Sequence, residues 1–250
     1  MWVVCSSLKP AGDILTIPAF FLPQNRHFSA LLRLVCKTKY YASFFNSLII
    51  AVCSTFLSVS LGTLAAYVFA RSRSRRLKGL LSLILTGRMM PAVALLIPLY
   101  MVVRQLNLVN TKASLIVAYT AMCLPFAIYM MMGFISQIPY EIEESGIIDG
   151  CSTFKVLVLL ILPLIGPGLA TTAIFNFLTG WNEYLFAVTF ISDSGARTIP
   201  VALMAFDTGR NTYWGPRFAL MVISLIPACV FTLAAQKYLV AGVTLGAVKG

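Results

Sequence analysis

Charged residues are scarce in this sequence of 250 residues. Lysine, arginine, aspartate and glutamate together make up 11% of it, eight residues are acidic, and there is one histidine. Soluble domains carry roughly 25% charged residues, because a surface in contact with water needs them. The scarcity of charge therefore excludes an ordinary soluble globular enzyme.

Motifs for chemistry are missing as well. The six cysteines show no metal-ligand spacing and are interpreted as small apolar residues. The sequence contains no Gly-x-x-x-x-Gly-Lys-Ser/Thr loop, so the chain is not expected to hydrolyse ATP by itself. The net charge of +11 comes without a basic and aromatic platform for nucleic acid. We therefore expect no catalytic residue, no metal, no cofactor and no nucleic-acid partner.

Apolar runs are abundant. Hydrophobic residues make up 59% of the chain, and the mean hydropathy is +0.88. A helix needs roughly 17–25 residues to cross the hydrocarbon core of a lipid bilayer. Four runs without Asp, Glu, Lys or Arg are long enough: 40–70, 113–140, 156–182 and 218–236. A fifth run, 79–103, is apolar except for Arg88 and contains Pro91 and Pro98. Because lipid cannot satisfy exposed backbone groups, we predict an all-α, polytopic transmembrane helical bundle with five full spans.

The segment 71–78, RSRSRRLK, follows the first long span directly. Five positive charges in one short loop indicate the cytoplasmic side of the membrane. Alternation then places the acidic loop 136–155 and the C-terminus in the cytoplasm, and the loops 104–112 and 193–217 outside.

The first residues differ from the rest of the chain. The segment 1–8 has too few apolar residues to span and lacks the basic start of a signal peptide. It is predicted to be the end of a truncated first span. The proline-containing segment 9–39 is then an extracytoplasmic loop, and 40–250 is the transmembrane domain.

Half of the acidic residues are concentrated between two apolar runs. Glu141, Glu143, Glu144 and Asp149 fall within nine positions. Carboxylates are favourable in the first turn of a helix, where Pro139 is also well suited. Gly150 is expected to end the helix with a positive φ, and Ser152 or Thr153 to cap the next one. The pattern predicts a short cytoplasmic helix at 139–149.

One flank of this predicted helix is almost bare of side chains. Ser145, Gly146 and Gly150 would let another backbone approach closely while the carboxylates present charge to it. A plain solvated connector is the alternative, but about four to six turn residues suffice for one. A docking element for a cytosolic partner explains more of the pattern.

The spacing of these residues resembles a known signature. The stretch from Glu144 to Gly150, followed after nine residues by Leu160, Leu162 and Pro163, is similar to EAA–x3–G–x9–I–x–LP. That signature marks the membrane subunits of bacterial binding-protein-dependent ABC importers. Other stretches resemble the MalG-like carbohydrate branch: SLKP (7–10), NSLIIAV (46–52), AAYVFAR (65–71), IPLY (97–100), LPFAIYMM (124–131), GWNEYLFA (180–187) and GVTLGAVKG (242–250). The family's two alanines are Ser145 and Gly146 here, and the glycine weakens a helix by roughly 1 kcal/mol relative to alanine.

The resemblance implies a multi-pass permease subunit of a bacterial inner membrane with six spans, the first of which this chain would enter part-way. Such a subunit pairs with a second homologous permease, sits on two copies of an ABC ATPase, and receives a carbohydrate from an extracytoplasmic solute-binding protein. The helix at 139–150 would be the coupling helix, seated in the ATPase, and the terminal GAVKG would point to the same partner. The implied ATPase-coupling residues are Glu143, Glu144, Ser145, Gly146, Asp149, Gly150, Leu162, Pro163, Lys249 and Gly250.

Two ionisable residues lie in apolar surroundings, where such residues are functional candidates. Glu183 is about 40 Å along a helix that starts at Val156, at or beyond the outer interface. Two roles are open for Glu183: it anchors the helix at the interface beside Trp181, or it lines the translocation path. Arg88, about 14 Å into its helix, should face the bundle interior or reach the interface, and pairing with Glu183 is a further alternative. The candidate path residues are Asn176, Trp181, Asn182 and Glu183.

Two other classes of membrane protein were considered. An ion-coupled secondary transporter of a small polar solute would have inverted repeats and ionisable residues at matching positions of two halves, and neither is clear in this sequence. An intramembrane enzyme would need paired aspartates, a Ser–His pair or metal ligands inside the spans. We therefore expect a transport subunit that is not an enzyme.

The predicted orientation is tested by cysteine labelling. Ser74→Cys and Ser194→Cys, each in a chain without its native cysteines, should react differently with a membrane-impermeant thiol reagent on intact cells. Position 194 should be labelled, and position 74 only after the membrane is opened. Labelling of position 74 but not 194 on intact cells would invert the topology.

Overall fold

The computed structural model describes residues 2–7, 9, 38–193, 195–207 and 212–247. These described residues form helices and one isolated β-bridge, between Asp207 and Thr212, and contain no longer strand. The prediction of an all-α chain is confirmed. Most of the predicted loop 9–39 lies outside the described residues, and so do Lys249 and Gly250.

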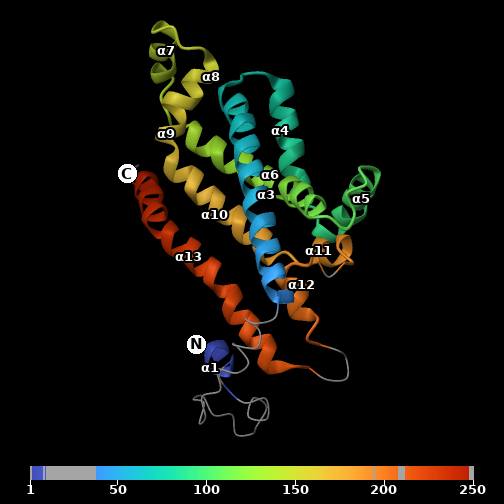
Figure 1. Ribbon diagram of the computed structural model, residues 1–250. Coiled ribbons are helices and arrows are strands. Elements are labelled where there is room, and N and C mark those ends of the chain that lie inside the picture. The colour runs from blue at the N-terminus through green and yellow to red at the C-terminus, as the bar shows by residue number, and fades with distance from the viewer. Residues whose placement is uncertain (1, 8, 10–37, 194, 208–211, 248–250) are drawn as a thin grey trace. The chain divides into compact units, whose positions relative to one another are not determined.

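Three long helices follow the predicted apolar runs (Figure 1). They are α3 (Thr38–Arg71), α6 (Lys112–Ile135) and α13 (Trp214–Ala247). Each is long and apolar enough to cross a membrane as a single helix. The predicted spans 40–70 and 218–236 are thus confirmed as helical, and 113–140 is helical as far as Ile135.

The other two predicted spans are sharply bent. Helices α4 (Arg75–Gly87) and α5 (Ala92–Gln105) meet at 108°, and the segment Thr153–Leu164 meets α10 (Gly166–Asn182) at 81°. Pro91 lies in the first bend, and Pro163 and Pro167 flank the second. Proline lacks an N–H and disfavours helical backbone at the residue before it. The described residues therefore contain three unbroken spans, or five if each bent pair crosses as one.

Short helices make up the rest of the described chain. They are α1 (Trp2–Ser7), α7 (Glu141–Ile148), α8 (Thr153–Val156), the π-helical turn η1 (Leu157–Ile161), α9 (Leu162–Leu164), α11 (Leu185–Phe190) and α12 (Ile199–Met204). The segment Thr153–Leu164 consists of α8, η1 and α9 and precedes the bend to α10.

The chain divides into two compact units. The first consists of Met1–Ile50, Val103–Leu115 and Trp181–Val230, and the second of Ala51–Val102, Ile116–Gly180 and Phe231–Gly250. Each unit has its own packing.

In the first unit, polar side chains of α3 hold the segment that leads into α12. The Asn46 amide donates hydrogen bonds to the carbonyls of Gly195 and Arg197 at 2.8 and 3.1 Å. The hydroxyl of Ser47 accepts the backbone N–H of Ile199 at 2.8 Å. Backbone groups near helix ends need such partners, and here a neighbouring helix supplies them.

In the second unit, three segments surround one apolar cluster. Its buried members are Ala66, Met131, Ile135, Val156, Leu157, Ile161 and Ile165, from α3, α6 and the segment 156–165. Helices α3 and α6 cross closely at Gly62, where an added Cβ would lie 2.6 Å from the Cβ of Ala127. Small residues at such crossings let membrane helices pack backbone to backbone.

Gly62→Leu should therefore destabilise the protein, whereas Gly79→Leu should not. A side chain at Gly62 collides with α6, while one at Gly79 meets no described atom within 4 Å. Overpacking costs about 1–3 kcal/mol, which corresponds to a melting temperature lower by roughly 2–12 °C. Thermal aggregation of the two detergent-solubilised variants measures the difference, and equal melting temperatures would contradict the close crossing.

Candidate functional site

The helix α7 lies at the same end of the second unit as the turn between α3 and α4 (Figure 1). Glu141, Glu143 and Glu144 occupy its first turn, as predicted. Gly150 follows it with φ of 84°, which confirms the expected positive φ. The hydroxyl of Ser152 caps α8 by accepting the backbone N–H of Lys155 at 3.4 Å. A short helix is present as predicted, with both boundary signals, but it spans Glu141–Ile148 rather than 139–149, so Pro139 precedes the helix and does not lie in its first turn.

A buried ion pair joins α7 to the end of α3. Nε of Arg71 donates to Oε1 of Glu143 at 2.5 Å, and the hydroxyl of Tyr67 donates to Oε2 at 2.8 Å. A second nitrogen of the guanidinium donates to the carbonyl of Ile138 at 3.0 Å. The guanidinium also lies over the ring of Tyr140, 5.9 Å from its centroid. We call Tyr67, Arg71 and Glu143 the α3–α7 clamp.

The clamp changes the interpretation of Glu143. Its side chain is turned into the protein, where the residue is 2% exposed, and both carboxylate oxygens are engaged by α3. A buried carboxylate needs such partners, because desolvation otherwise costs several kcal/mol. The expectation that all the carboxylates of this helix present charge to a partner is corrected for Glu143, which positions the helix instead.

Gly146 is also turned inward. An added Cβ would lie 2.6 Å from Cδ1 of Leu160 and 3.2 Å from Cγ2 of Val156. The small residue therefore lets α7 rest on the chain's own α8 and η1. The expectation that Gly146 admits the backbone of another protein is corrected by this contact.

The exposed side of α7 combines acidic and apolar residues. Glu144, Ile147 and Ile148 share one face at helical spacings of three and four, and Asp149 follows them. Ile148 is 84% exposed and Ile147 51% exposed. We call these four residues the α7 tip face. Exposed isoleucines beside carboxylates are typical of a surface that a partner covers.

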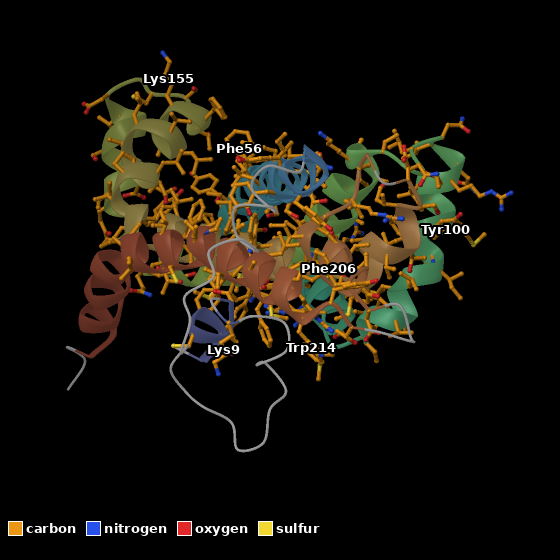
Figure 2. All side chains as sticks on the ribbon, turned by 60° about the horizontal axis from the view of Figure 1, so that its bottom comes forward. Lys9, Phe56, Tyr100, Lys155, Phe206 and Trp214 are labelled. Carbon is orange, nitrogen blue, oxygen red and sulfur yellow. The ribbon has the colours of Figure 1, made fainter. Side chains whose placement is uncertain are left out.

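Other residues border the tip face. Ser145 is exposed, and its hydroxyl donates to the carbonyl of Ile142 at 2.9 Å. Gly150 is exposed, and an added Cβ there would meet no described atom within 4 Å. Figure 2 shows the amino group of Lys155 pointing away from the ribbon. The two isoleucines were missed in the sequence, where their only signal was an apolar pair within a cytoplasmic acidic helix.

Leu162 and Pro163 lie elsewhere in the same unit. They follow η1 directly, at the start of α9. Leu162 packs against the apolar cluster and Pro163 is exposed. Because η1 carries the Leu160 side chain that contacts Gly146, these two residues shape the segment that supports α7.

Asn176 is a buried residue beside a cavity in the second unit. Asn176 is 1% exposed and donates to the hydroxyl of Ser58 at 2.8 Å. It borders a cavity of about 590 Å³ that Arg88, Phe126 and Thr179 also line. The Cζ atom of Arg88 lies 4.4 Å from the ring centroid of Phe126. Arg88 thus contacts α6 through Phe126 but is itself exposed, so neither alternative predicted for it is decided.

The remaining path candidates lie in the first unit. Trp181 is 3% exposed, and its indole N–H donates to the carbonyl of Ser224 at 3.1 Å. The carboxylate of Glu183 accepts the backbone N–H groups of Phe186 and Ala187 at 3.0 and 3.2 Å. Trp181 is therefore not an exposed interfacial aromatic, and Glu183 caps α11. The fourth candidate of the set, Asn182, is exposed.

Among the described residues, no three His, Cys, Asp or Glu side chains come together as a potential metal site. Glu143 lies in the buried clamp, Glu144 and Asp149 lie on the tip face, and Glu141 is exposed outside both.

Comparison with known proteins assigns the family. Residues 58–245 match the family described as "Binding-protein-dependent transport system inner membrane component". The chain belongs to this family. It is accordingly a multi-pass protein of a membrane and a component of a transport system.

Two curated relatives of this transport component match along its whole length. The sulfoquinovosyl glycerol transport system permease protein SmoH of Agrobacterium fabrum is 31% identical over 250 residues, covering 100% of this chain and 88% of SmoH. The diacetylchitobiose uptake system permease protein DasC of Streptomyces coelicolor is 31% identical over 249 residues, covering 100% of this chain and 90% of DasC.

A solved structure shares the fold of this transport component. It is the crystal structure of a bacterial ABC transporter involved in the import of the acidic polysaccharide alginate. The TM-score is 0.83 at 22% identity, over 95% of this chain and 88% of that one. The likeness confirms the predicted permease fold.

Removal of the buried charge should loosen α7. Glu143→Gln loses the charge-assisted bonds to Tyr67 and Arg71, and hydrogen bonds to charged groups contribute about 1.5–3 kcal/mol each. Backbone amides of residues 143–150 should then exchange hydrogen roughly 10- to 100-fold faster. Glu141→Gln, which changes an exposed carboxylate of the same helix, is the matched control. Equal exchange in both variants would mean that the clamp does not hold α7.

Proposed function

We propose that this chain is a permease subunit of an ATP-driven importer and forms the translocation path for a carbohydrate. The observation that carries the proposal is the likeness along the full chain to permeases named for the uptake of sugars and sugar derivatives. The carbohydrate is a sugar, an oligosaccharide, or a related polyol or glycerol phosphate.

The proposed assembly has four kinds of component besides lipid. This subunit pairs with a second, homologous permease, and the pair sits on two copies of an ABC ATPase. An extracytoplasmic solute-binding protein delivers the carbohydrate. ATP hydrolysis takes place in the ATPase subunits. This chain contributes no catalytic residue; it changes conformation and forms part of the translocation path.

In this proposal, α7 is the coupling helix and its tip face is the contact with the ATPase. Ile147 and Ile148 are the apolar anchors, since buried side chains at the centre of an interface carry most of the binding energy. Glu144 and Asp149 meet basic groups of the partner and fix the orientation. The terminal Lys249 and Gly250 are proposed to approach the same partner on the strength of the family resemblance.

The contacts of α7 within the chain indicate how motion would pass into the membrane. The clamp ties α7 to α3 through Glu143, and Gly146 seats it on η1 through Leu160. A displacement of the tip face would therefore move the end of α3 and the segment Thr153–Leu164 together. The 81° bend between that segment and α10 is a place where such a movement can be absorbed.

Of the four path candidates named from the sequence, two are proposed to line the translocation path. Asn176, beside the cavity in the second unit, and the exposed Asn182 are the candidates whose amides can meet a sugar hydroxyl. Trp181 and Glu183 serve the structure of the first unit through their bonds to Ser224 and α11.

The carbohydrate assignment is tested with the complete transporter in vesicles. The cognate binding protein is first screened by thermal shift against a panel of neutral and acidic mono- and oligosaccharides and polyols. Binding protein loaded with a ligand found in this way should stimulate ATP hydrolysis and ligand uptake. Stimulation only by amino acids, peptides or metal ions, added as a comparison panel, would overturn the assignment.

Changes in and beside the tip face should weaken the stimulation of the ATPase by loaded binding protein. Glu144→Lys places a like charge against a basic partner, which can cost several kcal/mol. Gly150→Leu forces a side chain into backbone with φ of 84° and fills the open flank. Ile148→Glu removes an apolar anchor. Each should lower the ATPase activity stimulated by loaded binding protein at least about tenfold, with normal insertion into the membrane.

Two controls accompany these variants. Glu141→Gln alters an exposed carboxylate outside the tip face and should leave stimulation unchanged. Gly150→Asn tolerates a positive φ and should retain more activity than Gly150→Leu. If the Glu144→Lys, Gly150→Leu and Ile148→Glu variants all co-purify with the ATPase and transport normally, α7 is a plain connector.

A further inference from the structure

Arg88 is an exposed residue of this subunit and carries a positive charge inside the predicted membrane region. It directly follows α4, whose 13 residues extend about 20 Å from the cytoplasmic loop, within a hydrocarbon core of about 30 Å. In the part of the chain that the structure describes, no carboxylate forms an ion pair with its guanidinium; the one ion pair found joins Arg71 and Glu143. A bare cation at this depth costs at least a few kcal/mol, so a partner is expected.

The surroundings of Arg88 show where that partner would bind. The guanidinium lies over the ring of Phe126 on α6, with 4.4 Å between Cζ and the ring centroid. Both residues line the cavity of about 590 Å³, together with Asn176 and Thr179 of α10. This volume is within the 300–1,000 Å³ typical of ligand pockets. The residues all belong to the second unit, so the pocket is formed within one compact body.

We propose that this pocket binds the acidic group of the transported solute, so that the substrate is a carbohydrate bearing a carboxylate, sulfonate or phosphate. This inference rests on the proposed function. The guanidinium can donate two parallel hydrogen bonds to an oxyanion, which a lysine cannot do in the same geometry. The ring of Phe126 offers an apolar surface to a sugar ring, and the hydroxyl of Thr179 can bond to a sugar hydroxyl.

Arg88 differs from the other polar groups described in the spans. Asn176 donates to Ser58, and the hydroxyl of Thr179 donates to the carbonyl of Phe175, so these side chains have bonds within the chain. The guanidinium of Arg88 contacts an aromatic ring and faces the cavity. A cation–π contact contributes about 0.5–2 kcal/mol and neutralises no charge. An anion from outside the chain completes the site.

The charge and accessibility of the pocket are tested without knowing the substrate. Thr179→Cys, in the complete transporter without native cysteines, places an exposed thiol in the pocket. The quantity measured is the reaction rate of a negatively charged methanethiosulfonate divided by that of a positively charged one. This ratio should be higher when Arg88 is present than in the same protein carrying Arg88→Gln. The expected change in the ratio is about tenfold, from one unit charge several ångströms away.

Protection from labelling distinguishes the possible anions. A galacturonate disaccharide should slow the reaction, and the galactose disaccharide of the same linkage should not. No protection by the acid would indicate a lipid headgroup at Arg88 and overturn the proposal. An equal rate for both reagents, with or without Arg88→Gln, would indicate a carboxylate of the second permease and also overturn it.

Uptake into vesicles completes the test. For an acidic sugar that the binding protein delivers, Arg88→Gln should lower the uptake rate at least about tenfold, and Arg88→Lys should have a smaller effect. Arg104→Gln, a change of an exposed arginine at the end of α5, is the control and should transport normally. Import of a neutral sugar at an unchanged rate by Arg88→Gln would overturn this inference and leave the proposed function standing. Import of no carbohydrate by the unchanged protein would overturn the proposed function itself.

Discussion

The position of the short helix α7 depends on the ion pair between Arg71 and Glu143. These two residues are 72 residues apart in the sequence, and they meet where α3 ends and α7 begins. An isolated helix of eight residues is not stable in water, because nucleation is unfavourable and few hydrogen bonds follow. The α3–α7 clamp and the seat of Gly146 on Leu160 supply the tertiary contacts that α7 needs. With both in place, the opposite side of α7 is left exposed.

The absence of water in the bilayer explains the use of polar residues elsewhere. Asn46 and Ser47 satisfy the backbone before α12, and Glu183 satisfies the first turn of α11. Each polar side chain does locally what solvent does in a soluble protein. These polar groups thus serve the structure, whereas Arg88 is exposed and its guanidinium contacts the ring of Phe126.

Two departures from the family signature meet in the structure. The signature has alanine where this chain has Gly146, and isoleucine where it has Leu160. An added Cβ at Gly146 would lie 2.6 Å from Cδ1 of Leu160, so the smaller residue makes room for the differently branched one. The contact between α7 and η1 is retained, and the helix propensity lost at Gly146 is offset by packing.

The sequence by itself determined the helical membrane fold, the short acidic helix with its stop at Gly150, and the family. These features follow from local composition and spacing, to which apolar run length, helix dipoles and glycine conformation respond directly. The sequence could not separate Glu143 from Glu144, because adjacent carboxylates look alike until one of them meets Arg71. It could not show the exposure of Ile147 and Ile148, or the bends that divide two apolar runs. Only the tertiary structure decided these, since burial, ion pairing and the lining of a cavity depend on segments that are far apart in the chain.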